Sequence, residues 1–357
     1  MLFLLPLLPA FRELVRPRDV AALPVPVKFD LQPDKFATRF RQYLAYRLGG
    51  DPDLVVASIA RAEQYLHGSG FHVIGRNGAP CFDANEQSSR ATCKLLLGVA
   101  IELPAGFTFK QEVFATRELR VGDNATLRAV YAQAGLRIGE GSRLQRWAHA
   151  ARVQIGPRCH LQGRVTADEC ITIGPGTIFG RLNAPRIDFC GAGEHLGEIT
   201  YETSGTTVAC VEFPNRVELA SNDPRTIVRG DANVPRGGLV KGDLIAYGDV
   251  QVGRSARVLG SVKAHGRLTI APDARVEGAL IAVQDLEVGC NAHVDGPVSG
   301  EHVIYLQPGS RVGASDALTS VVAPVIRVAA GSVVFGTVWA EADGLALDHT
   351  ATQQEKS

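Results

Sequence analysis

The stretch that decides the fold runs Leu268-Thr-Ile-Ala-Pro-Asp-Ala-Arg-Val-Glu-Gly278, and it recurs eighteen positions later as Leu286-Glu-Val-Gly-Cys-Asn-Ala-His-Val-Asp-Gly296. A column of aliphatic residues keeps the same step: Val250, Leu268, Leu286 and Ile304. A repeat of this length is typical of one coil of a parallel β-helix, in which short strands alternate with corners. The sequence therefore predicts a solenoid.

A shorter period of six residues divides each repeat into three sides. It is carried by Val252, Val258, Ala264, Ile270, Val276, Ala282, Val288 and Val294. Inward aliphatic residues alternate with outward polar ones, and no single coil can bury its apolar face alone. The predicted fold class is an all-β solenoid, a parallel β-helix of about 18 residues per coil, with a small α-helical segment before it. Glycines at 260, 278 and 296 mark a corner, where we expect a positive φ.

The same period predicts two runs of coils. The first covers residues 99–189 and is marked by Ile101, Leu119, Leu136, Val153, Ile171 and Ile187; the second covers residues 226–340. Between them, residues 190–225 break the pattern and are interpreted as an insertion. Residues 341–357 are expected to form a polar tail.

A small helical segment is predicted within residues 28–98. Phe36, Phe40, Tyr43 and Leu44 have helical spacing, and a second helix is expected to begin near Asp51 and end before Gly68. The Gly- and Asn-rich stretch from 68 to 89 is interpreted as a loop. If the helices fold over the first coil, they act as the cap that keeps a solenoid soluble.

Composition excludes several classes of function. The 357 residues include 37 basic and 37 acidic side chains, so nothing in the overall charge favours nucleic acid. The seven cysteines form no CxxC pair or metal-ligand spacing, which favours buried free thiols in a reducing cytoplasm; a Cys190–Cys210 disulfide is the alternative for an exported chain. No metal site, cofactor site or catalytic set is predicted.

The amino-terminal segment, residues 1–27, joins an apolar tip to basic residues. The predicted membrane contacts are Leu2, Phe3, Leu4, Leu5, Leu7, Leu8, Arg12, Arg16 and Arg18. The tip is too short to span a bilayer, but apolar insertion with arginines at anionic headgroups gives reversible attachment. The alternative is that Leu4, Leu5, Leu8 and Phe11 pack onto the protein as a short helix.

The segment from Gly248 to Ala340 resembles the bactofilins, a bacterial family of polymer-forming cytoskeletal proteins. The resemblance lies in the repeat quoted above, which returns more loosely at 304–313 and at 326–336. It implies a right-handed β-helix, self-assembly without nucleotide and a short membrane-targeting amino terminus. Terminal coils with unpaired strand edges independently favour assembly.

Two other chemistries remain open. Arg257, Arg275, His293 and Arg311 form an outward column that could bind an anionic polymer, although the neighbouring Glu277 and Asp295 offer neutralisation within the sheet. The [LIV]-Gly steps, such as Ile155-Gly156, also resemble hexapeptide-repeat acyl- and nucleotidyl-transferases, which have a left-handed coil. The resemblance to those enzymes implies a general-base histidine in a cleft between subunits, with His149, His160, His265 and His293 as candidates.

The sequence thus predicts a cytoplasmic scaffold that is peripheral to the inner face of the cytoplasmic membrane. Its expected partners are further copies of itself and envelope-related proteins, without nucleic acid and without enzymatic activity. The transferase is the alternative.

Overall fold

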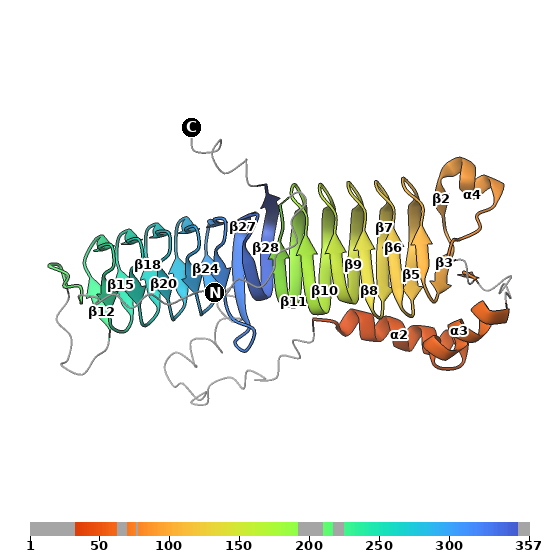
Figure 1. Cartoon of the computed structure of the whole chain (residues 1–357), viewed down its shortest axis with the longest axis horizontal. Coiled ribbons are helices and arrows are strands. Elements are labelled where there is room, and N and C mark those ends of the chain that lie inside the picture. Colours follow the sequence, from red (N-terminus) through yellow and green to blue (C-terminus); the bar gives the residue numbers. More distant parts are fainter. Residues whose placement is uncertain (1–32, 63–69, 76–77, 192–209, 217–224, 349–357) are drawn as a thin grey trace, which may run out of the picture. The chain divides into compact units, whose positions relative to one another are not determined.

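A computed structural model describes residues 33–348, except for 63–69, 76–77, 192–209 and 217–224. The chain divides into two units, Met1–Lys35 and Phe36–Ser357, and the second contains the fold. This fold is a β-solenoid of about 13 turns with about 18 residues per coil, which confirms the predicted fold class. Figure 1 shows two series of coils, which we name the first and the second solenoid.

In the second solenoid, parallel strands build three faces. Face 1 contains β12 (Thr226–Val228), β15 (Leu244–Ala246), β18 (Val262–Ala264), β21 (Leu280–Ala282) and β24 (Val298–Gly300). Face 2 contains β13 (Ala232–Val234), β16 (Val250–Val252), β19 (Leu268–Ile270), β22 (Leu286–Val288) and β25 (Val303–Leu306). Face 3 contains β14 (Leu239–Val240), β17 (Arg257–Val258), β20 (Arg275–Val276), β23 (His293–Val294) and β26 (Arg311–Val312). The long strands β27 (Thr319–Ala329) and β28 (Val333–Leu347) turn the corners between faces.

The first solenoid has the same three faces. Its short strands are β1 (Phe71–Val73) and β3 (Leu95–Gly98) on face 1, β2 (Ala91–Thr92) on face 2, and β4 (Ile101–Leu103), β6 (Glu118–Val121) and β8 (Gly135–Ile138) on face 3. Long strands that turn corners complete it: β5 (Thr108–Ala115), β7 (Thr126–Ala132), β9 (Arg143–Ile155), β10 (His160–Ile173) and β11 (Ile178–Phe189).

The interior of both solenoids is aliphatic, as the six-residue period predicts. All eight residues of that period, from Val252 to Val294, have 0% exposure. Burial of each such valine or isoleucine stabilises the fold by about 1.5–3 kcal/mol. One core cluster extends through both solenoids, from Ile74 to Ala346.

The two solenoids meet end to end and point in opposite directions. The last strand of the first solenoid, β11, pairs with the last strand of the second, β28, and this pairing is antiparallel. It includes all three faces, with Ile178 opposite Leu345, Leu182 opposite Val338 and Ile187 opposite Val334. We name this contact the joint. Figure 1 shows β28 beside β11, between the two series of coils.

The reversal changes the order in which the chain visits the faces. The second solenoid runs through faces 1, 2 and 3 in turn, and the first runs through them in the order 1, 3, 2. This reversed order of faces is expected when two coils of the same hand run in opposite directions along one axis. Both carboxyl-terminal solenoid ends are therefore buried inside one chain.

The expected positive φ at the glycine column is wrong. None of Gly260, Gly278 and Gly296 has a positive φ; instead each lies against the coil before it, and a Cβ on Gly278 would come within 2.4 Å of Ser261 N. The left-handed corner belongs to another column, made of Gly237, Ser255, Asp273, Asn291 and Gly309, with φ between 55° and 74°. Asn and Asp tolerate this conformation, which explains why glycine is not needed at each turn.

The two expected helices are present as α2 (Lys35–Leu48) and α3 (Pro52–Ala62). Asp51 Oδ1 accepts a hydrogen bond from Asp53 N at 2.9 Å, and proline stands at the first helical position of α3. The helices do not close the end of the first solenoid, as a cap would. They cover face 1 instead, because that face carries apolar outward residues, among them Phe114 and Tyr131.

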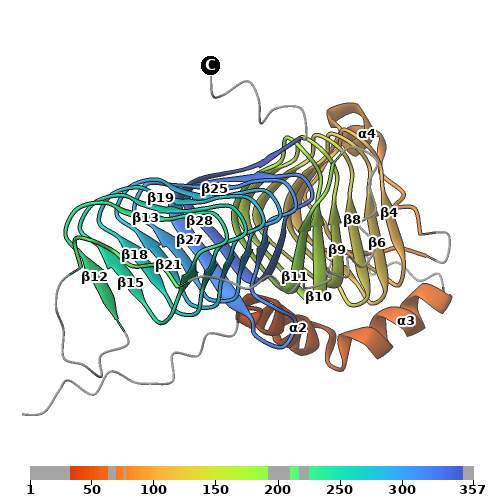
Figure 2. The same cartoon turned by 60° about the vertical axis from the view of Figure 1, so that its left-hand side comes forward.

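The solenoid also extends past the boundaries expected at both ends. Strands β1, β2 and β3 precede residue 99, a short helix α4 (Ala84–Ser89) occupies the expected loop, and β28 continues to Leu347 within the expected tail. Figure 2 shows the resulting coils from a second direction.

Candidate functional site

Three parts of the solenoid could mediate assembly: the joint, the two free ends and the outward columns of the faces. At the joint, Asn183 Nδ2 donates to Thr337 Oγ1 at 2.6 Å, and the Arg181 guanidinium lies 4.8 Å from the centre of the Trp339 ring. Inside, Leu182 and Val338 have 0% exposure. The joint is thus packed like an ordinary pair of neighbouring coils.

The free end of the first solenoid is closed by an aromatic side chain. Phe82 stacks on Phe107, with ring centres 4.3 Å apart, and its ring centre is 6.4 Å from that of Phe109. Phe107 and Phe109 belong to the core cluster and are 5% and 2% exposed. Phe82 therefore shields apolar residues that a terminal coil would otherwise expose to water.

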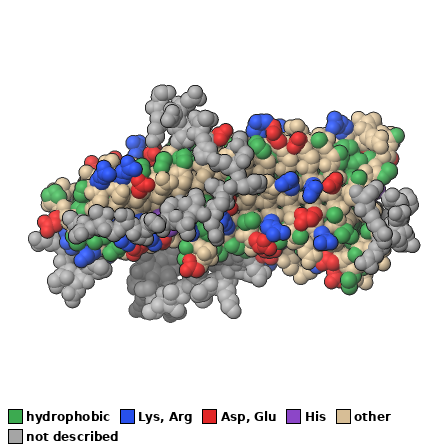
Figure 3. Space-filling view, viewed as in Figure 1, with side chains coloured by type: hydrophobic (Ala, Val, Ile, Leu, Met, Phe, Trp, Pro, Cys, Tyr) green, Lys and Arg blue, Asp and Glu red, His purple; other side chains and the backbone are tan. Residues whose placement is uncertain are grey.

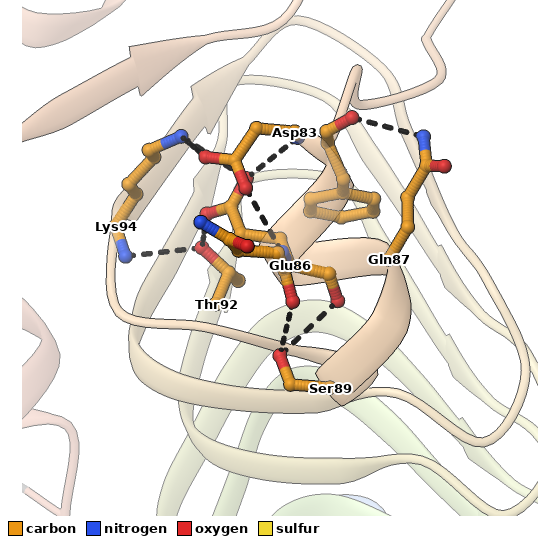
Figure 4. Close-up of polar contacts among 8 residues, drawn as sticks. Asp83, Glu86, Gln87, Ser89, Thr92 and Lys94 are labelled. Atoms are coloured by element: carbon orange, nitrogen blue, oxygen red, sulfur yellow. Dashed lines mark hydrogen bonds and ion pairs between the residues drawn. The ribbon is translucent and has the colours of Figure 1, made fainter.

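A polar network next to Phe82, which we name the latch, holds α4 in place (Figure 4). Asp83 accepts from Glu86 N at 2.9 Å, and Glu86 accepts from Asp83 N at 3.1 Å, which is a capping box. Glu86 also accepts from Thr92 Oγ1 at 2.7 Å and from Lys94 Nζ at 3.0 Å. Helix α4 was not predicted from sequence, although Asp83-Ala-Asn-Glu86 has the spacing of a capping box.

The latch holds its carboxylates in the charged form. Burial raises the pKa of Glu86, but the hydrogen bonds from Thr92, Asp83 N and Lys94 outweigh it, so this pKa lies below its usual 4.5. The pKa of Asp83 is lowered, chiefly by the bond from Glu86 N. Both groups therefore stay ionised near neutral pH.

The free end of the second solenoid is covered by residues 210–216. Cys210 forms a parallel bridge with Leu239 of β14, and Arg216 forms an antiparallel bridge with Val228 of β12. Val211 and Phe213 pack against the core cluster. Both free ends thus carry a segment that is not a coil, and each segment places a phenylalanine on the core.

The segment between the solenoids, expected to be an insertion, connects the joint to this far end. Cys190 lies at the end of β11, and Cys210 lies seven coil steps away along face 3, a distance of about 34 Å at 4.8 Å per step. A Cys190–Cys210 disulfide is therefore excluded, because bonded cysteines have Cα atoms within about 7 Å.

None of the seven cysteines forms a disulfide, and they are not all buried. Cys159 and Cys190 are buried, and burial raises the pKa of the Cys159 thiol to about 11. Cys81, Cys93 and Cys210 are exposed, contrary to the expectation from sequence.

The structure places the predicted anion-binding residues in one register column of face 3, in the order Arg257, Arg275, His293 and Arg311. The neutralisation predicted from sequence is present. Arg257 Nη2 donates to Glu277 Oε1 at 3.3 Å, and Arg275 Nη2 donates to Asp295 Oδ2 at 2.9 Å. Arg311 lies over the Phe335 ring at 4.7 Å. These local partners favour a structural role for the column.

His293 is the exception in this column because its charge is disfavoured. Burial lowers the pKa of His293, and the neighbouring Arg275 and Arg311 lower it further, against the opposing effect of Asp295. The Nε2 atom lies 3.0 Å from Asp295 Oδ1. The ring is therefore neutral near neutral pH.

The four candidate histidines of the transferase alternative are not brought together. His149 lies on face 1 and His160 on face 2 of the first solenoid, His265 follows β18 in the second, and His293 lies on face 3. His149 Nδ1 lies 2.8 Å from Thr166 Oγ1, and Thr166 is only 1% exposed.

The predicted membrane contacts, from Leu2 to Arg18, lie outside the described residues. Among the helices that the structure describes, none combines the length and the hydropathy needed to cross a membrane. Within the described ranges, no three His, Cys, Asp or Glu side chains are grouped so that they could hold a metal ion. Figure 3 shows basic and acidic side chains intermixed over the coils on the face in view.

Comparison of the chain with protein-family models, with curated proteins and with solved structures finds no match.

Proposed function

We propose that this chain is a non-catalytic scaffold of the bactofilin type, which associates with copies of itself and positions envelope-related proteins at the inner face of the cytoplasmic membrane. The observation that carries the proposal is the continuity of the three faces. Face 3, for example, continues in register from Arg257 through Arg311, Val333 and Asp188 to Thr172. A solenoid of this kind offers partners an extended surface of evenly spaced positions.

The scaffold is supported over the transferase by the surroundings of the histidines. A general base must reach the proton that it removes. The histidine with the most developed polar surroundings, His149, is itself only 7% exposed and lies against the buried Thr166 hydroxyl. His265 stacks on Tyr247 with ring centres 5.3 Å apart. These contacts are typical of structural residues.

Self-association is tested by sedimentation velocity of the full chain over about 1 to 100 µM, where weak and moderate association becomes visible. The proposal expects the weight-average sedimentation coefficient to rise with concentration. A single monomeric species over the whole range would contradict it.

Membrane attachment needs a separate experiment. The full chain and a variant without residues 2–11 are floated with vesicles that contain anionic lipids and with neutral vesicles. Flotation of the full chain with anionic vesicles only, and its loss in the deletion variant, is expected, because the apolar tip and the arginines act together. Equal flotation of both proteins would contradict this part of the proposal.

A further inference from the structure

One outward column of the second solenoid is apolar over most of its length. On face 1, the strands from β12 to β28 place seven residues in register, which we name the face 1 column: Ile227, Ile245, Lys263, Ile281, Ser299, Val322 and Trp339. Ile281 is 40% exposed and Trp339 is 39% exposed. Figure 2 shows the strands of face 1 side by side.

The other faces of the second solenoid are different in character. The corresponding column of face 2 is largely polar and contains Asn233, Gln251, Thr269, Glu287, Tyr305 and Arg327. Face 3 carries the ion pairs of Arg257 and Arg275. Face 1 is thus the apolar face of the second solenoid.

The same face of the first solenoid is already an interface. There α2 packs onto Trp147 through Phe36 and Phe40, with ring centres 5.0 and 5.4 Å apart. Trp147 lies three coil steps beyond Trp339, through Arg181 and Arg164. The face 1 column therefore continues a surface that buries aromatic and aliphatic side chains elsewhere in this chain.

The order of residues in the face 1 column is self-complementary about Ile281. One step away on either side are Lys263 and Ser299, both polar, and two steps away are Ile245 and Val322, both aliphatic. At three steps, Ile227 corresponds to Trp339. If a copy is rotated by 180° about the strand direction at Ile281, apolar residues meet apolar ones, and each Lys263 meets a serine rather than another lysine.

A flanking column at the edge of face 1 repeats this symmetry with charge. Two positions after the residues of the face 1 column are Arg229, Tyr247, His265, Val283, Glu301, Pro324 and Glu341, of which the first five lie directly after the ends of their strands. The same rotation places Val283 opposite itself and Tyr247 opposite Pro324. It also places His265 opposite Glu301 and Arg229 opposite Glu341. The side chains of Arg229 and His265 thus each face a carboxylate, which is the complementarity that fixes register in an isologous contact.

Within the described residues, the free ends and the helices leave room for such a contact. The end at β12 is covered by residues 210–216, and α2 lies on the coils of Arg164 and Trp147 and on those beyond them. In an antiparallel pair, α2 of each copy therefore lies past β12 of the other. The contact extends over six coil steps, or about 29 Å.

We propose that a second copy of this chain binds face 1 of the second solenoid, with the two solenoids antiparallel and a two-fold axis at Ile281. This inference rests on the proposed self-association and names its surface. Assembly through this face is lateral, since both carboxyl-terminal solenoid ends are used in the joint.

The two-fold axis is tested by cross-linking. In a chain whose exposed Cys81, Cys93 and Cys210 are replaced by serine, Ile281→Cys is treated with a short bismaleimide, because facing sheets are about 10 Å apart. The control is Gln251→Cys, an exposed outward position of face 2. Rapid dimeric cross-links at 281 and slow ones at 251 are expected. Equal rates at the two positions would overturn the proposal.

The register is tested by charge reversal in the full chain. His265→Glu places a second carboxylate opposite Glu301 in both halves of the contact, and the dimer dissociation constant should rise at least about tenfold. Adding Glu301→Lys should restore association, because the carboxylate introduced at position 265 then faces a lysine. Failure of the double variant to recover would overturn the proposal.

The outcomes separate the two levels of the argument. If the wild-type chain associates but position 281 does not cross-link preferentially, the surface is wrong and the proposed self-association stands. If the wild-type chain is monomeric at every concentration, both fail.

Discussion

Asn183 Nδ2 donates a hydrogen bond to Thr337 Oγ1 at 2.6 Å across the joint, although the two residues are 154 positions apart in the sequence. They belong to the last strands of their solenoids, and their antiparallel pairing shows that the two carboxyl-terminal ends meet. In an ordinary solenoid, one such end needs a separate cap. Here each solenoid end covers the other.

The joint predicts a specific cross-link. Asn183→Cys together with Thr337→Cys, in a chain without the exposed cysteines, should form an intramolecular disulfide, because directly opposed antiparallel residues have Cα atoms about 4.5–5.5 Å apart. Mass spectrometry of the oxidised monomer checks it. The control is Asn183→Cys with Ser320→Cys, since Ser320 pairs with Thr337 on the side away from Asn183. A disulfide in the control and none in the test pair would rule out the register of the joint.

The two kinds of corner predict opposite responses to substitution. Gly278→Ala should lower the free energy of unfolding by about 1–3 kcal/mol or more, because its Cβ would lie 2.4 Å from Ser261 N. Gly237→Asn should be nearly neutral, since no atom lies within 4 Å of a Cβ there and Asn291 holds the same conformation in its own coil. Chemical denaturation measures both variants. Equal losses would show that the corners have been assigned incorrectly.

Loss of the latch should open the end of the first solenoid. Glu86→Ala leaves Thr92, Lys94 and the Asp83 amide without their shared acceptor, and the expected cost is about 1–3 kcal/mol. Hydrogen exchange should rise in α4 and β2 and stay unchanged in β20. The matched control is Gln87→Ala in the same helix, where the exposed side chain bonds only Phe82 O. Unchanged exchange in α4 would argue against the latch.

The latch also predicts a dependence on acid. Because the folded-state pKa of Glu86 lies below 4.5, its contribution to stability is present above that pH and is lost as the pH falls through the folded value. The difference in unfolding free energy between wild type and Glu86→Ala should therefore shrink in strong acid.

His293 should also make the folded protein less stable in acid, and its effect should begin at a higher pH than that of Glu86. Its folded-state pKa lies below the usual 6.5, so protonation favours the unfolded chain and stability falls as the pH drops below 6.5. Unfolding by urea at about pH 7.5 and about pH 5.5 should show a smaller pH dependence in His293→Gln than in wild type. An identical dependence in both proteins would mean that His293 does not titrate as proposed.

Sequence periodicity was sufficient to predict the coils, because every inward position of a solenoid must be apolar and repeats at a fixed step. It also located α2 and α3 from their apolar spacing. The role of the corner glycines was harder to predict, since a glycine suits both a positive φ and a close backbone approach. At Gly278 the close approach of Ser261 N is the reason for glycine, whereas the positive φ is adopted by a non-glycine residue, Asp273.

The joint had no signal in the sequence. Leu182 and Val338 follow the same inward apolar pattern as the residues of any other coil. That pattern does not indicate that the last strands of the two solenoids, β11 and β28, pair with each other. The ion pairs of the Arg257 column could be predicted from sequence, because Glu277 and Asp295 recur on the same face. The self-complementarity of the face 1 column becomes visible only when the register from Ile227 to Trp339 is known.

The central claim, a self-associating scaffold, is tested most directly by negative-stain electron microscopy of the full-length chain at concentrations where it sediments as an assembly. The account predicts solenoids paired side by side in antiparallel orientation, with Ile281→Asp returning them to single particles. Compact particles with three-fold symmetry, unaffected by that substitution, would contradict the scaffold and favour the transferase.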